Sequence, residues 1–167
     1  IPTYVPKPPI ELPMFFEKKP YQGATGRLYP LPYSDGITDE KRDVSYEVYT
    51  LENEYVKTQI LPEIGGKILS GYDKIGDYDF IYHNHVIKPA LVGLAGAWIS
   101  GGIEFNWPQH HRPTTFLPIE AAAEENDDGS KTVWVGEVEP FNRQKGMVGV
   151  TVEPGRSYIR AKVRLYN

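Results

Sequence analysis

The residues best suited to chemistry are concentrated in one stretch, residues 98–113. It holds two of the three tryptophans and two of the four histidines, together with a glutamate, an asparagine and an arginine. Aromatic rings stack on the apolar face of a pyranose, while carboxylate, amide and guanidinium groups form planar hydrogen bonds with its hydroxyls. The composition therefore predicts a carbohydrate site. A structural loop whose tryptophans fill the core is the alternative.

Three residues of this stretch are candidates for proton transfer, namely Glu104, His110 and His111. An imidazole can act as a general acid near neutral pH. Because adjacent residues of an extended chain point in opposite directions, only one of the two histidines can readily face a ligand. The candidates for substrate binding are Trp98, Asn106, Trp107 and Arg112.

The spacing suggests a role for several of these side chains. Glu104 and Asn106 are two residues apart, so on an extended segment they share one face and could bind adjacent hydroxyls. Trp107 is the expected stacking wall, because the proline that follows it restricts its backbone. Arg112 could add a forked donor to an acidic or hydroxylated ligand.

His83 and His85 offer a different chemistry. A His-x-His pair on a strand places both rings on one face, and His110 or His111 with Glu104 could complete a metal site. Nothing in the sequence fixes the distance between the two clusters. We therefore expect no metal and no other cofactor.

The length, charge and composition of the chain exclude several classes of function. The chain has 167 residues, a net charge of −4 and mixed signs, which argues against non-specific binding of nucleic acid. No apolar run approaches the ~20 residues that span a bilayer, so no membrane partner is expected. The absence of cysteine excludes disulfides, thiolate zinc sites and a cysteine nucleophile. It leaves the compartment open, with the cytoplasm slightly favoured.

The elements that must position these residues are strands. Apolar and polar residues alternate with a period of two along much of the chain, and no convincing helix is found. In residues 157–166 the apolar side chains face one way and the basic side chains the other, which predicts an antiparallel sheet with one wet face. Hairpin turns are expected at residues 126–130 and 154–155. Strands are expected at residues 44–49, 55–60, 67–73, 78–83, 119–125, 131–139, 147–153 and 157–166.

Two regions are not expected to form such strands. Residues 1–43 are predicted to be a proline-rich arm, whose aromatic residues between 10 and 33 pack on the body; a disordered tail is the alternative. Residues 84–118 are rich in glycine and proline and are expected to be a long irregular loop, which is usually functional. Residues 44–167 are then the domain itself.

Three pieces of the sequence, in this order, resemble a known family. Residues 53–71, with Leu-Pro followed by Gly-Gly, and residues 101–111, with Gly-Gly, Trp-Pro and His-His, are similar to galactose mutarotase-like domains. With residues 147–167 they resemble more closely an uncharacterised bacterial domain of that fold, which often precedes tetratricopeptide repeats. The mutarotase pattern His-Gly-x-x-Arg is replaced here by His-His-Arg-Pro.

The resemblance implies an all-β fold, an antiparallel β-sandwich that is the first half of a galactose mutarotase-like supersandwich. The chain begins at Ile1, and a strand runs up to Asn167, so we expect a truncated domain. Its open edge at residues 157–166 is expected to pair with the remaining half or with another copy. The mutarotase base would lie outside this chain, so the chain alone is expected to be inactive.

Three functions remain open on this basis. The first is a sugar-binding domain related to aldose epimerases and to glycoside hydrolases of the same fold. The second is a carbohydrate-binding module without catalysis. The third is an interaction domain of a tetratricopeptide-repeat protein, with a degenerate pocket.

Overall fold

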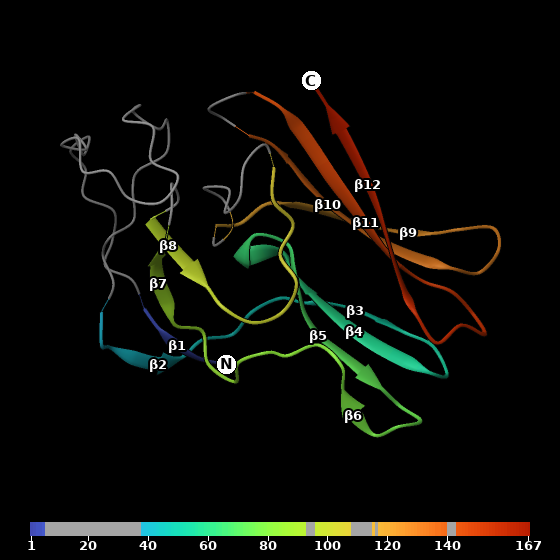
Figure 1. The fold of residues 1–167 in the computed structure, drawn as a ribbon, viewed down its shortest axis with the longest axis horizontal. Coiled ribbons are helices and arrows are strands. Elements are labelled where there is room, and N and C mark those ends of the chain that lie inside the picture. Colours follow the sequence, from blue (N-terminus) through green and yellow to red (C-terminus); the bar gives the residue numbers. More distant parts are fainter. Residues whose placement is uncertain (6–37, 93–95, 108–114, 116, 140–142) are drawn as a thin grey trace.

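Two four-stranded antiparallel sheets form the body of the protein (Figure 1). The computed structural model describes residues 1–5, 38–92, 96–107, 115, 117–139 and 143–167. In one sheet the strand order is β3-β4-β5-β6, with bounds Tyr49–Glu52, Val56–Leu61, Lys67–Asp73 and Tyr78–Asp79. In the other the order is β12-β11-β10-β9, with bounds Ile159–Tyr166, Lys145–Val152, Lys131–Val138 and Glu120–Glu125.

Two short two-stranded sheets lie beside the body. One pairs β1 (Pro2–Tyr4) with β2 (Lys41–Asp43), and the other pairs β7 (Pro89–Val92) with β8 (Gly96–Ile99). Within the described residues, the one helical segment is the short 3₁₀ turn η1 (Pro62–Ile64) between β4 and β5. The prediction of an all-β antiparallel sandwich is thus confirmed. No helix in the described ranges is long and apolar enough to cross a membrane.

The core lies between the two large sheets, and strand alternation explains which side chains fill it. On β4, Val56, Thr58 and Ile60 point inward and are each at most 2% exposed. Facing them are the valines of β10 and β11, with Trp107 closing one end of the same cluster. Burial of such side chains is the main favourable term in folding. The buried aliphatic residues of this cluster are Leu51, Val56, Ile60, Ile68, Ile81, Val133, Val135, Val148, Val150 and Val152.

Asn53 ties the turns of the two sheets together. Its Oδ1 accepts hydrogen bonds of 2.8 Å from the backbone amides of Tyr55 and Val56, which closes the β3–β4 turn. Its Nδ2 donates to the carbonyl oxygens of Glu153 and Arg156, in the β11–β12 turn, at 2.6 and 2.7 Å. One side chain therefore holds the ends of both hairpins at a fixed separation, because it satisfies backbone groups on each.

The hairpin predictions are confirmed, and three other predictions are corrected. Residues 44–48 are not a strand, because their backbone and side chains bond elsewhere; Glu47 N, for example, donates to Glu63 Oε1 at 2.6 Å. The loop predicted at residues 84–118 contains the β7–β8 pair. Residues 80–83 do not extend β6, which ends at Asp79.

A further correction concerns β12, whose apolar face is not buried along its whole length as alternation predicted. Val163 and Leu165 are 54% and 64% exposed. On the adjacent strand their neighbours are buried: Val148, the cross-strand partner of Val163, is 0% exposed. The core therefore reaches β12 only at its first residue, Ile159, which is partly buried against the cluster. The expectation that residues 10–33 pack on the body falls outside the described residues; β1 itself forms a bridge between Thr3 and Ile87, just before β7.

Candidate functional site

Residues 101–107, which carry part of the predicted site and are called the crossing segment below, cross the edge of β5 as an extended chain. Ile68 N donates to Ile103 O at 2.9 Å, and Ile103 N donates to Ile68 O at 2.8 Å. This close approach depends on Gly102, whose φ is +71° and whose position leaves no room for a side chain. A Cβ there would lie 2.2 Å from the carbonyl oxygen of Ile68. Gly102 therefore fixes the course of the segment over β5.

Alternation along this segment separates an apolar face from a polar one. Ile103 and Phe105 line the groove between the two sheets, and Trp107 is 4% exposed in the core. Glu104 and Asn106 point to the opposite side, where the amide Nδ2 of Asn106 donates to Oε1 of Glu104 at 2.9 Å. The expectation that these two residues share a face thus agrees with the geometry.

Trp107 lies apart from them, against the second sheet. Its indole ring packs on Gly146 of β11, where a Cβ would come within 2.3 Å of the ring. This is the position of a core tryptophan, the alternative that the sequence left open, and it differs from the stacking wall expected beside Glu104. A ligand that contacts Glu104 meets the other face of the segment.

Glu104 is the best-anchored acidic group of the polar face. Its second oxygen, Oε2, accepts a 2.6 Å hydrogen bond from Oγ1 of Thr115, which is 4% exposed. Two side chains therefore orient the half-buried carboxylate, one on each oxygen. Hydrogen bonds to an ionised acceptor are shorter and stronger than those between neutral groups.

Lys67, at the start of β5, is a member of the site that sequence reasoning missed. Its side chain is almost fully buried, and Nζ donates to the carbonyl oxygen of Ile99 at 2.8 Å. Burial lowers the pKa of Lys67 from 10.5 to about 8, and the negative charge of Glu104 partly opposes this shift. The only signal in the sequence is its place between Gly66 and the apolar residues of β5.

Four of the predicted residues cannot be placed in the site. His110, His111 and Arg112 lie outside the described residues. Trp98 belongs to β8, where its backbone pairs with Ala90, and its side chain is outside the description as well.

The alternative of a metal site starts from the two remaining histidines. The rings of His83 and His85 lie edge to face, with centroids 4.9 Å apart. In the ranges that the structure describes, no group of three or more side chains of the types that bind metals is found.

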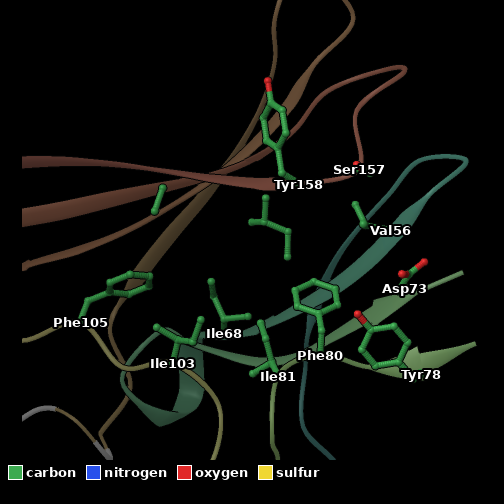
Figure 2. Close-up of a pocket in the computed structure, with 12 residues that line it drawn as sticks. Val56, Ile68, Asp73, Tyr78, Phe80, Ile81, Ile103, Phe105, Ser157 and Tyr158 are labelled. Atoms are coloured by element: carbon green, nitrogen blue, oxygen red, sulfur yellow. The ribbon is translucent and has the colours of Figure 1, made fainter. Parts of the chain in front are cut away.

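An apolar groove of about 600 Å³ opens on the other face of the segment, between the two sheets. Figure 2 shows Ile103 and Phe80 pointing into it from below and Phe105 from the left, with Tyr158 at the top and its ring directed upward. The sequence did not indicate this groove, because its walls come from strands of both sheets. Its lining residues are Val56, Ile68, Asp73, Tyr78, Phe80, Ile81, Ile103, Phe105, Ser157, Tyr158, Ile159 and Ala161.

Fold and site define an antiparallel β-sandwich domain with a polar cluster on one crossing segment. The family model described as "Domain of unknown function (DUF5107)" matches residues 24–167, and the chain belongs to this family. It is also similar to a solved structure described as a TPR-domain containing protein from Parabacteroides distasonis ATCC 8503. The sequences are 25% identical with a TM-score of 0.84, over 99% of this chain and 27% of that one.

The chain therefore corresponds to about a quarter of the length of that protein, given the 27% coverage. The description of the solved protein agrees with the expected association of this domain with tetratricopeptide repeats. The likeness to galactose mutarotases stays a prediction from the sequence.

Proposed function

We propose that this domain binds a carbohydrate on the polar face of the crossing segment, through Glu104 and Asn106. The observation that carries the proposal is the anchored carboxylate of Glu104, held by Asn106 on one oxygen and by Thr115 on the other. A carboxylate whose orientation is fixed before a ligand arrives loses little freedom on binding. The planar amide beside it supplies a donor and an acceptor of matching geometry.

A sugar suits this face better than an anion or an apolar ligand. The charge of Glu104 disfavours anions, and hydroxyl groups can donate to its carboxylate. Lys67 keeps positive charge beneath the site, so the local field is nearly balanced and favours a neutral polar ligand. The resemblance to sugar epimerases supports the same ligand class, and catalysis by Glu104 with His110 or His111 would be an addition to binding.

A glycan array tests this proposal directly. The fluorescently labelled chain would be applied to immobilised monosaccharides and oligosaccharides, and hits would be measured in solution by calorimetry. We expect saturable binding that free sugar competes away and that Glu104→Gln weakens. Absence of binding to every glycan, at protein concentrations up to the millimolar range, would remove the carbohydrate proposal.

One observation favours a second candidate, an interaction domain within tetratricopeptide-repeat proteins. The apolar groove and the exposed face of β12 form a surface lined mostly by aliphatic and aromatic side chains, with Asp73 and Ser157 as the polar exceptions without a ring. Large exposed apolar patches mark sites of protein–protein contact. The two functions use opposite faces of the crossing segment and can therefore be separated by mutation.

A further inference from the structure

In the part of the chain that the structure describes, the edge strand β12 has an unpaired backbone edge and an exposed apolar face. It lies at the end of its sheet, with β11 as its one partner among these residues, and it is eight residues long. Val163 and Leu165 are more than half exposed, while Ile159 and Ala161 continue the same row into the groove. A long edge of this kind is a template for pairing with another strand, unless it is blocked by charge or covered.

The opposite face of β12 is basic, and this defines what can pair with it. Arg160, Lys162 and Arg164 point outward, and their cross-strand partners on β11 are uncharged: Thr151, Gly149 and Met147. Arg160 contacts Glu153 at 2.7 Å, and Arg164 lies over the ring of Trp134, 4.8 Å from its centroid. A strand added beside β12 would place every second side chain next to this basic row.

Self-pairing is disfavoured by the same row of charges. Two copies of β12 related by a two-fold axis would run antiparallel, with Lys162 opposite Lys162 and Arg160 opposite Arg164. Like charges directly opposite each other destabilise an antiparallel pair. The favoured occupant therefore carries acidic residues on one face and apolar residues on the other.

We propose that β12 and the groove bind a β-strand in which apolar and acidic side chains alternate, supplied by polypeptide outside residues 1–167. Its apolar side chains cover Val163 and Leu165 and enter the groove, while its acidic side chains lie beside Arg160, Lys162 and Arg164. In the similar TPR-domain protein the match takes up 27% of the chain, so that protein has ample further polypeptide to supply such a strand. This inference is independent of carbohydrate binding.

Two synthetic peptides test the proposal on the chain of residues 1–167. One is an eight-residue peptide of alternating valine and glutamate, matching the length of β12, and its control has lysine in place of glutamate. We expect the acidic peptide to bind, to protect every second amide of β12 from hydrogen exchange, and to bind at least about tenfold more tightly than the basic one at low salt. Equal affinity for both peptides, or binding of neither, would overturn the proposal.

Two further measurements keep the outcome decisive. The double variant Lys162→Glu with Arg164→Glu changes exposed residues only, so the fold is retained, and its preference should switch to the basic peptide. A circular dichroism spectrum that matches the parent chain verifies folding. Sedimentation of the chain without peptide should give a monomer. A dimer with protected β12 amides would instead identify a second copy as the occupant and contradict the proposal.

Discussion

The indole ring of Trp107 packs so closely on Gly146 that residue 146 has no room for a side chain. A Cβ at residue 146 would lie 2.3 Å from the indole ring, and the ring itself is 4% exposed. The Trp107 side chain therefore anchors the crossing segment to β11, and it joins the candidate site to the core of the sandwich.

Removing this ring should destabilise the protein while leaving carbohydrate contacts on the other face intact. Trp107→Ala is expected to lower the free energy of unfolding by about 3–5 kcal/mol, the usual range for a buried aromatic residue. Urea denaturation measures the change, and Ile75→Ala, at a residue that is 74% exposed, is the control. A variant that keeps its stability but loses sugar binding would show that the ring stacks on the ligand.

Gly102 should be the least replaceable glycine of the crossing segment. Gly102→Ala introduces a Cβ 2.2 Å from the backbone oxygen of Ile68, whereas Gly129→Ala, with a similar positive φ, has its nearest neighbour at 3.5 Å. The control should lose about 1 kcal/mol from backbone strain alone. Gly102→Ala should lose roughly 3 kcal/mol or more, because backbone must also move. Equal losses, measured by urea denaturation, would show that the approach to β5 is looser than described.

Lys67 should make the free energy of unfolding depend on pH in the alkaline range. Between about pH 8 and 10.5 the folded chain releases the Lys67 proton while the unfolded chain keeps it. The unfolded state then binds more protons, so the free energy of unfolding contributed by Lys67 rises with pH through this window. The full gain is at most about 3 kcal/mol.

The comparison with Lys67→Met isolates this contribution from the titration of the tyrosines. The stability of the parent chain relative to this variant should increase from pH 7.5 to pH 10, as measured by chemical denaturation at each pH. Lys57→Met, at an exposed residue of β4, should show no such trend. A constant difference between the parent and Lys67→Met would mean that the pKa of Lys67 is not lowered.

The sequence predicted those parts of the fold whose structure is set by the local residue pattern. It failed where partners distant in the sequence set the structure. The turns at residues 126–130 and 154–155, and the strands beside them, follow from local alternation and glycine placement, and these predictions are confirmed. Residues 44–48 alternate equally well, yet their backbone partners lie elsewhere, at Ile1 and Glu63. Alternation cannot reveal a competing partner that is remote in the sequence.

In the candidate site, too, some residues are placed by local pattern and others by contacts distant in the sequence. The shared face of Glu104 and Asn106 follows from a spacing of two, and the hydrogen bond between them fits it. Trp107 obeys that alternation too. Because Asn106 points outward, the next side chain, Trp107, points into the core. Lys67 was missed because its position beneath the crossing segment depends on the bridge between Ile68 and Ile103, which no local pattern encodes.

The substitution Glu104→Gln tests the central claim most directly, through calorimetric affinity for the glycan that binds best on the array. Glutamine keeps the size and one acceptor, so stability should fall by no more than about 1.5 kcal/mol. Loss of the charged acceptor should weaken sugar binding about 10- to 100-fold. Glu52→Gln, which removes an exposed carboxylate paired with Lys74, is the matched control and should leave affinity unchanged. Unchanged affinity in Glu104→Gln, together with a marked loss of stability, would contradict the account, because Glu104 would then serve the loop alone.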